Sequence, residues 1–348
     1  MDVNVKNFLN IRYSIKNLSD SEFETILPEL ASQLENVDFI IQYTDEKLKT
    51  DWKKLCEWKS NDDYINSTSR VGMKLCEHFF PNFYEIENNK GKSFSNLWTK
   101  DNLEKILRWN RKSHSTPYLS ELRRGIYFCC GMTKSTMFRP QMSKLLCMKY
   151  QPKIVLDPCA GWGGRMLGSL AAAPDTHYCG FEPDTNTCDG LMNILSDEAI
   201  PSNVTNRAEI WNEPVEQMLP TIQEKYDLVL TSPPYFNLEL YTSGSQSTQS
   251  FPTWNEWADK WLKPVILGCL ACLKENGTSC WSVKNFQSDK KYPLADITKK
   301  IHEEAGWKLV KTVKMTGSGR MGGKRIEEGS ATRQSEEETF CFQKNASG

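Results

Sequence analysis

The chain has 348 residues, with 43 basic and 44 acidic side chains and a formal net charge of −1. This near balance excludes a protein that binds nucleic acid through overall positive charge, so any such surface must come from local segregation of charge. The sequence has no apolar run long enough to span a bilayer and no N-terminal secretion signal. We expect a cytoplasmic protein whose 12 cysteines are reduced and act as small apolar side chains.

The N-terminal part of the chain has the pattern of helices. Ser21 and Glu24 have the spacing of a capping box, and apolar residues follow at helical intervals. A second amphipathic pattern covers residues 46–58. We therefore predict a mostly helical region over residues 1–115, a candidate for DNA recognition, and a second domain over residues 116–348.

Basic residues predominate between residues 100 and 149, where the only acids are Asp101, Glu104 and Glu121. Aromatic side chains are interleaved with them, at Trp109, Tyr118, Tyr127 and Phe128. Such a stretch fits a surface that follows phosphates, because neutralising them releases counterions. It also fits an ordinary solvated helix face, and both interpretations stay open.

A glycine-rich turn follows the apolar run over residues 154–156. It reads Asp157-Pro158-Cys159-Ala160-Gly161-Trp162-Gly163, and a run of small residues typical of a helix comes next. The turn lacks both the phosphate-binding lysine of a P-loop and the spacing of a dinucleotide-binding motif. What remains is an acid at a strand end beside bare backbone, which suits a ligand with a positive amino group.

The second domain alternates between strand and helix patterns. The predicted strands lie near residues 153–157, 177–182, 207–211, 226–231, 277–285, 307–315 and 339–344. This alternation predicts an α/β protein with a doubly wound sheet and helices on both faces. Ligands of such sheets bind at the carboxyl ends of the strands.

A second motif begins 75 residues after Asp157, at the end of the fourth predicted strand. It reads Ser232-Pro233-Pro234-Tyr235-Phe236. A polar residue, a rigid double proline and aromatic residues therefore stand at a strand end.

Together the two motifs resemble those of amino-methyltransferases that use S-adenosylmethionine. In that family the first motif reads Asp-Pro-Phe-x-Gly-x-Gly, and the second reads Asp, Asn or Ser followed by Pro-Pro and Tyr or Phe. The resemblance covers residues 135–344. The Ser-Pro-Pro-Tyr version looks most like enzymes that methylate N4 of cytosine, and the overall resemblance is greatest to phage-type DNA methylases. It implies a class I methyltransferase fold, a Rossmann-like seven-stranded sheet.

The resemblance implies that the first motif holds the methionine end of S-adenosylmethionine. Asp157 would bind the ammonium group, while Gly161 and Gly163 allow close backbone approach. Cys159 stands where the family has phenylalanine, so Trp162 would fill that edge of the site.

Other implied cofactor contacts follow the next two strands. Glu182 would accept both ribose hydroxyls, and Asn212 or Glu213 would read the adenine. Thr136 and Phe138 match a family motif that covers the methionine end.

The second motif would act on the substrate amine. The Ser232 oxygen and the Pro233 carbonyl are two acceptors that can draw an exocyclic nitrogen towards tetrahedral geometry, and Pro234 helps to aim them. Tyr235 and Phe236 would stack on a base that is flipped out of the duplex or single-stranded. A glycine-rich loop over residues 317–325 offers Arg320, Lys324 and Arg325 for phosphate or base contacts.

We therefore expect a DNA methyltransferase acting on N4 of cytosine, without a metal, as a monomer or homodimer not bound to a membrane. Methylation of N6 of adenine is the first alternative. RNA or a protein glutamine as substrate follows, since related sites serve both. A protein on the same fold that only binds DNA is the last alternative. It should lack an intact second motif or ribose acid, whereas this sequence has both.

Overall fold

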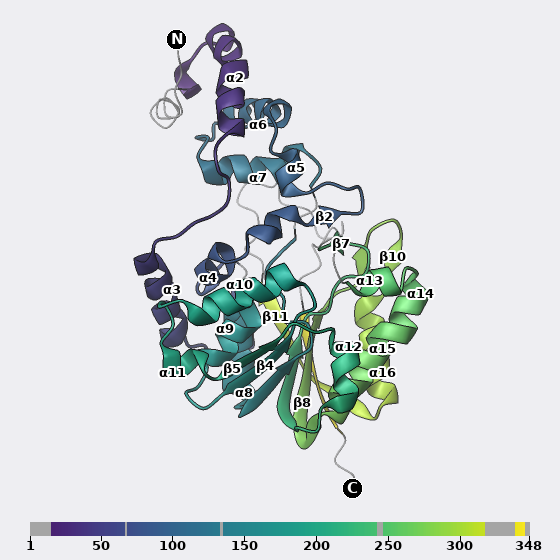
Figure 1. Cartoon of the computed structure of the whole chain (residues 1–348). Helices are drawn as coiled ribbons and strands as arrows, with labels where there is room; N and C mark the ends of the chain where they lie inside the picture. Colours follow the sequence, from purple (N-terminus) through teal and green to yellow (C-terminus); the bar gives the residue numbers. More distant parts are fainter. Residues whose placement is uncertain (1–14, 67, 133–134, 242–245, 317–337, 345–348) are drawn as a thin grey trace. The chain divides into compact units, whose positions relative to one another are not determined.

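The computed structural model describes residues 15–66, 68–132, 135–241, 246–316 and 338–344. The chain forms two compact units, both drawn in Figure 1. Unit 1 comprises residues 1–41, 81–136 and 239–243, and unit 2 comprises residues 42–80, 137–238 and 244–348. Each unit is therefore assembled from three stretches of chain.

Unit 1 is mostly helical. Its elements are η1 (Ile15–Asn17), α2 (Asp20–Glu35), η2 (Pro81–Glu85), β2 (Glu87–Asn88), α5 (Phe94–Leu97), α6 (Lys100–Lys112), α7 (Leu119–Cys129) and β7 (Glu239–Leu240). Helix α6 packs against both α2 and α7, and their apolar faces form a core that includes Leu27, Leu103 and Ile126. The short strands β2 and β7 pair antiparallel.

Helix α2 begins earlier than the sequence predicts. Its capping box uses Ser19 and Glu22, whose backbone and side chains bond reciprocally, and not Ser21 and Glu24. Both serine–glutamate pairs have the required spacing, so the sequence pattern is ambiguous by two residues. Glu24 is instead bound to Arg108 of α6.

Unit 2 is built on a sheet that contains all seven predicted strands. They are β3 (Ile154–Asp157), β4 (His177–Phe181), β5 (Ala208–Trp211), β6 (Tyr226–Thr231), β8 (Leu273–Val283), β11 (Trp307–Thr316) and β12 (Glu338–Lys344). Their spatial order is β11-β12-β8-β6-β3-β4-β5, with only β12 antiparallel to its neighbours. This is the strand order of the class I methyltransferase fold, so the predicted α/β fold class is confirmed.

An eighth strand extends this sheet beyond the predicted seven. Strand β1 (Tyr64–Asn66) pairs parallel to the outer edge of β11. It comes from the N-terminal part of the chain, as do α3 (Asp45–Glu57) and α4 (Met73–His78) of the same unit. A single division after residue 115 therefore does not describe the two units.

Helices cover the sheet in two groups (Figure 1). One group contains α8 (Pro140–Tyr150), α9 (Gly164–Leu170), α10 (Thr185–Ser196) and α11 (Ser202–Thr205). The other contains α12 (Val215–Met218), η3 (Leu219–Thr221), α13 (Ser247–Ser250), α14 (Trp254–Trp257), the π-helical η4 (Ala258–Leu262), α15 (Lys263–Ala271) and α16 (Leu294–Glu304). The short strands β9 (Phe286–Gln287) and β10 (Lys291–Tyr292) form a hairpin before α16.

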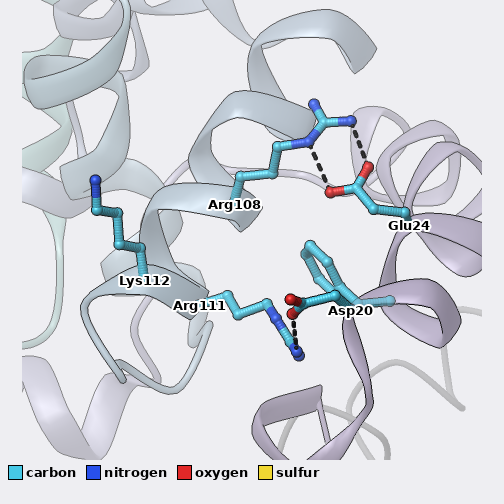
Figure 2. A pocket seen from close by; sticks show the side chains of 6 residues that line it. Asp20, Glu24, Arg108, Arg111 and Lys112 are labelled. Atoms are coloured by element: carbon cyan, nitrogen blue, oxygen red, sulfur yellow. Dashed lines mark hydrogen bonds and ion pairs between the residues drawn. The ribbon is translucent and has the colours of Figure 1, made fainter.

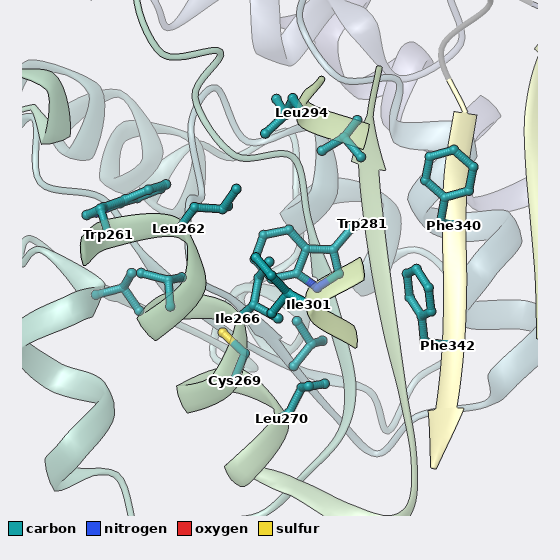
Figure 3. Close-up of a cluster of buried hydrophobic side chains, with 14 of the residues drawn as sticks. Trp261, Leu262, Ile266, Cys269, Leu270, Trp281, Leu294, Ile301, Phe340 and Phe342 are labelled. Atoms are coloured by element: carbon teal, nitrogen blue, oxygen red, sulfur yellow. The ribbon is translucent and has the colours of Figure 1, made fainter. Parts of the chain in front are cut away.

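Trp281 lies at the centre of the core of unit 2. Figure 3 shows it between the apolar side chains of α15 and α16 and the phenylalanines Phe340 and Phe342 of β12. Its indole N–H donates to Ser279 Oγ at 2.9 Å, so its polar atom is satisfied within the core. Trp257 and Trp261 are also buried, and Trp254 is partly buried. Among the described residues, no helix combines the length and apolar character needed to span a membrane.

Candidate active site at the carboxyl ends of the strands

Both sequence motifs lie on neighbouring strands of unit 2. Strands β3 and β6 are parallel partners in the sheet, with Leu156 opposite Val229. Asp157 is the last residue of β3, and Ser232 directly follows β6. Because parallel strands end at the same edge, the glycine turn and the Ser-Pro-Pro-Tyr turn lie beside each other.

The turn after β3 has a backbone that requires glycine. Gly161 and Gly163 have φ angles of +55° and +75°, a region that side chains rarely adopt. At Gly164 an added Cβ would lie 2.1 Å from the Phe138 carbonyl oxygen. The Ala160 N–H donates to the Phe181 carbonyl at 2.8 Å and ties the turn to the end of β4. These contacts hold the turn in one conformation. Gly163 and Gly164 are buried, whereas Gly161 is partly exposed.

The Asp157 carboxylate, predicted to bind the ammonium group of the cofactor, accepts hydrogen bonds from three donors of the chain itself. It is fully buried, and Arg165 Nε donates to its Oδ2 at 2.6 Å. Tyr178 donates its hydroxyl to the same oxygen at 2.7 Å, and the Cys159 N–H donates to Oδ1 at 3.2 Å. The Arg165 guanidinium also lies over the Phe138 ring, 5.0 Å from its centroid. Asp157 therefore shapes the turn, because an arginine eight residues later already neutralises it.

The pKa of the Tyr178 phenol is raised well above its usual value by burial and by the Asp157 carboxylate. Tyr178 therefore stays protonated and remains a donor to Asp157. Neither Arg165 nor Tyr178 was among the predicted site residues. The signal for Arg165 was its place at the start of the helix after the glycines, and nothing in the sequence pattern marked Tyr178.

Glu182 lies against the glycine turn, at the end of β4. Its Oε2 accepts the Gly161 N–H at 2.9 Å, and its Oε1 accepts the Asp184 N–H at 3.0 Å. Burial raises the pKa of the Glu182 carboxyl to about 7. This acid therefore stands beside the turn, where the sequence predicts a ribose contact, and it titrates near neutral pH.

Asn212 and Glu213, which follow β5, are exposed, and Asn212 contacts the backbone of Glu182. Asn212 Nδ2 donates to the Glu182 carbonyl at 2.8 Å, and the Thr185 hydroxyl donates to Asn212 Oδ1 at 3.2 Å. Glu213 is exposed. Of the two predicted adenine contacts, Asn212 is thus the one that the structure connects to Glu182.

The Ser-Pro-Pro-Tyr turn is anchored by its tyrosine. The Lys284 N–H donates to the Tyr235 hydroxyl at 3.1 Å, and the Tyr235 ring meets Phe286 edge-on at 5.4 Å. Ser232 and Pro234 are partly exposed, while Pro233 is buried. Within the part of the chain that the structure describes, the buried hydroxyl of the preceding Thr231 has no hydrogen-bond partner. The serine is thus accessible on a turn whose far end is fixed.

Phe236 has an unusual backbone conformation, with a φ angle of +42°. Bulky residues rarely adopt positive φ, and such strain persists only where the surroundings enforce it. Its buried ring packs within 6 Å of Trp254, Trp257 and Tyr292. Both predicted stacking residues, Phe236 and Tyr235, therefore pack against the protein's own aromatic side chains, and neither ring is offered to solvent.

The remaining predicted site residues differ from one another in burial and position. Phe138 is partly buried beside Arg165, whereas Thr136 is exposed and belongs to the segment counted with unit 1. Pro158 is buried, and Cys159 and Trp162 are partly exposed. Arg320, Lys324 and Arg325 lie outside the described residues.

Two arginines of the basic stretch in unit 1 are paired with acids of α2. A pocket of about 290 Å³ is lined by Asp20, Phe23, Glu24, Arg108, Arg111 and Lys112. Figure 2 shows Arg108 paired with Glu24 and Arg111 with Asp20, while Lys112 points away from both acids. The local excess of basic residues in the sequence therefore overstates the charge of this surface.

A family model described as DNA methylase matches residues 226–348. The match begins at the first residue of β6 and includes the Ser-Pro-Pro-Tyr turn. In the comparison with curated proteins, none matches this chain.

Several solved methyltransferase structures are similar to the chain at low identity. An S-adenosylmethionine-dependent O-methyltransferase from Thermotoga maritima is 13% identical, with 67% of this chain and 74% of that chain covered and a TM-score of 0.40. TrmN from Thermus thermophilus is 15% identical, with 59% and 48% covered and a TM-score of 0.37, so the match spans about half of that protein. NSun6 from Pyrococcus horikoshii is 11% identical, with 59% and 51% covered and a TM-score of 0.39. At this level of similarity the three structures carry no argument about activity or substrate. The strand order and the family match together support an S-adenosylmethionine-dependent methyltransferase.

Proposed function

We propose that the chain transfers a methyl group from S-adenosylmethionine to an exocyclic amine of a base in DNA, with N4 of cytosine as the first choice. The observation that carries this proposal is the Ser-Pro-Pro-Tyr turn, which follows the strand next to the glycine turn. The family match over residues 226–348 supports DNA as the substrate. Such a substrate implies an intracellular protein.

The residues at the glycine turn fit the proposed cofactor. Gly161 is partly exposed and has no side chain, so a ligand can approach its backbone, and Glu182 lies beside it as an acceptor for ribose hydroxyls. Asn212, bonded to the Glu182 carbonyl, is the nearest candidate for the adenine. When bound, S-adenosylmethionine supplies a methyl group activated by its sulfonium.

The second motif would prepare the amine. The lone pair of an exocyclic amine is delocalised into the base, so the nitrogen is a weak nucleophile. The Ser232 oxygen and the Pro233 carbonyl would accept its two hydrogens and draw it towards tetrahedral geometry. The proline pair fixes these acceptors in advance, and alignment of the amine with the methyl group provides most of the remaining acceleration. The target base must leave the duplex to reach this turn.

Product analysis tests the reaction. The protein would be incubated with methyl-labelled S-adenosylmethionine and, in separate reactions, single-stranded DNA, duplex DNA, RNA or a protein mixture, and the labelled nucleic acid digested to nucleosides. We expect N4-methylcytosine. N6-methyladenine would move the target to the alternative base, and label found only in RNA or protein would overturn the proposal of a DNA substrate.

Replacement of Ser232 tests its role. We expect Ser232→Ala to lower kcat by about 100-fold, the usual effect of losing one preorganised polar contact, while the affinity for S-adenosylmethionine stays unchanged. The exposed serine of α11 supplies the control, Ser202→Ala, which should leave both values unaltered. Full activity of Ser232→Ala would remove the serine from the mechanism.

A further inference from the structure

Helices α6 and α7 of unit 1 carry an exposed surface of aromatic and cationic side chains. None of these residues belongs to the two sequence motifs of the candidate active site. Phe128 is 62% exposed, more than any other large apolar side chain among the described residues. Its ring stacks on that of Trp109, with centroids 5.6 Å apart and planes 15° apart. The Arg124 guanidinium lies 5.3 Å from the Phe128 centroid and 5.7 Å from that of Trp109. We call these residues, with Lys105 and Lys112, the Phe128 patch.

The geometry of the Phe128 patch differs from that of a single exposed side chain, which would need no explanation. Two stacked rings and a guanidinium keep Phe128 in one orientation, so little conformational entropy remains to be lost when a flat group binds it. Arg124 is one helical turn before Phe128, with its side chain 55% exposed. The patch is therefore a preorganised, flat and accessible apolar surface.

The charges around the Phe128 patch are mostly positive. Lys105 and Lys112 stand one turn before and one turn after Trp109 on α6. Neither takes part in an ion pair among the described residues, whereas Arg108 and Arg111 of the same helix are paired with acids. Three acids lie among these basic residues: Glu121, 3.2 Å from Arg124 Nη1, and Asp101 and Glu104, within one turn of Lys105 on α6. The partner that this surface fits is therefore flat, apolar and negatively charged.

We propose that the Phe128 patch binds a single-stranded stretch of nucleic acid, with a base stacked on Phe128 and neighbouring phosphates near Lys105 and Lys112. Every base has a flat face and every linkage carries a negative charge, so a single strand meets both requirements without a particular sequence. Arg124 adds a cation over the same ring system. The inference rests on the proposed function, because it takes the substrate to be a nucleic acid. It goes beyond that function by assigning a second contact, for the strand beside the target base.

Fluorescence anisotropy with labelled oligodeoxythymidylate tests the patch on the full chain. We expect Phe128→Leu, which keeps an apolar side chain but removes the flat ring, to weaken binding about tenfold. Phe128→Tyr should restore it. The control is Leu267→Ala, an exposed apolar residue of α15 in unit 2, which should bind like the unmodified protein. Thermal melting of each variant checks that it is folded.

The salt dependence of oligonucleotide affinity tests the role of Lys105 and Lys112. Because each neutralised phosphate of a single strand adds about 0.7 to the slope of log affinity against log salt, Lys105→Gln with Lys112→Gln should lower the slope by about 1 to 1.5. Phe128→Leu should leave the slope unchanged, since no charge is lost.

The outcomes separate this inference from the proposed function. If the unmodified protein methylates DNA but Phe128→Leu binds the oligonucleotide with unchanged affinity, the proposed role of the Phe128 patch is overturned and the proposed function stands. If no nucleic acid is methylated but the patch variants lose oligonucleotide affinity, the proposed role of the Phe128 patch stands and the proposed function is wrong. A change of oligomeric state in Phe128→Leu, without any change in oligonucleotide affinity, would show a protein interface and also overturn the patch.

Discussion

Arg165 reaches back from the first turn of α9 to Asp157 at the end of β3, so a buried ion pair closes the glycine turn from within. The two charged atoms are 2.6 Å apart, and both side chains are almost completely excluded from solvent. Such a pair contributes little net stability compared with apolar packing, but breaking it leaves a charge buried without a partner. Its role is therefore to define the shape of the turn.

Removal of Arg165 should destabilise the protein strongly. We expect Arg165→Met to lower the free energy of unfolding by about 3 to 5 kcal/mol, because Asp157 would stay buried and uncompensated. Adding Asp157→Asn to that variant should recover part of the loss. Urea unfolding measures both. The matched control is Lys153→Met, which removes the exposed ion pair with Asp175 and should cost less than about 1 kcal/mol. Equal costs for the two single variants would contradict the assigned role.

Binding of S-adenosylmethionine should depend on pH through Glu182. The pKa of this carboxyl is about 7, and only the ionised form accepts both ribose hydroxyls. At pH 6 roughly one molecule in ten carries the ionised form, so affinity at pH 6 should be up to about tenfold weaker than at pH 8. Isothermal titration calorimetry measures the affinities. Glu182→Gln should bind weakly at both pH values, and Glu224→Gln, at an exposed acid just before β6, should retain the pH dependence.

The strain at Phe236 can be separated from its packing. Phe236→Ala removes the ring but keeps a side chain at a φ angle of +42°, whereas Phe236→Gly removes both the ring and the strain. We expect both variants to be less stable than the parent, with Phe236→Gly more stable than Phe236→Ala by about 1 kcal/mol. Thermal melting gives the comparison. If alanine proved the more stable of the two, the positive φ would not be a source of strain.

The stability of unit 2 should fall in mild acid because of His302. Its ring lies between the Ser279 hydroxyl and the Thr298 carbonyl, and burial lowers its pKa to about 4. In the unfolded chain the imidazole titrates near pH 6.5, so the unfolded state binds more protons between the two values. The contribution of His302 is therefore fully present above pH 6.5 and is lost as the pH falls towards 4.

That loss amounts to about 3 kcal/mol, from the difference between the two pKa values. Urea unfolding at a series of pH values measures it. His302→Leu provides the comparison, because it keeps all other titrating groups and removes this one. The parent should lose about 3 kcal/mol more than the variant between pH 7 and pH 4. Parallel profiles for the two proteins would show that the imidazole is not buried in its neutral form.

The fold of unit 2 was largely predictable because its central strands β3 and β6 are buried on both faces. Residues 154–156 and 228–230 are continuous apolar runs that end in polar or glycine-rich turns, and this pattern marks strand and strand end together. The placement of Glu182 beside the glycines followed from the same reasoning, since acids at neighbouring strand ends meet at one edge. Strand β1 was missed because three residues carry too little periodicity to recognise.

The details of the site depended on contacts between distant residues. The Arg165 and Tyr178 contacts with Asp157 form only when the helix and the next strand pack together, so the sequence motif alone indicated a free acid. The basic stretch shows the same effect, because Arg108 and Arg111 are paired with acids more than 80 residues earlier. The composition of a short stretch does not show which distant acids will pair with its basic residues.

The N-terminal strand β1 has a practical consequence for anyone who wishes to produce the methyltransferase part alone. A fragment beginning at residue 116 would lose β1 and expose the backbone hydrogen-bonding groups of β11. Exposed strand edges promote edge-to-edge aggregation. It would also lose α3, whose last carbonyls, of Leu55 and Cys56, accept the buried ammonium of Lys144. We therefore expect a fragment cut before residue 116 to aggregate, and a shorter version should keep residues 42–80, which contain α3 and β1.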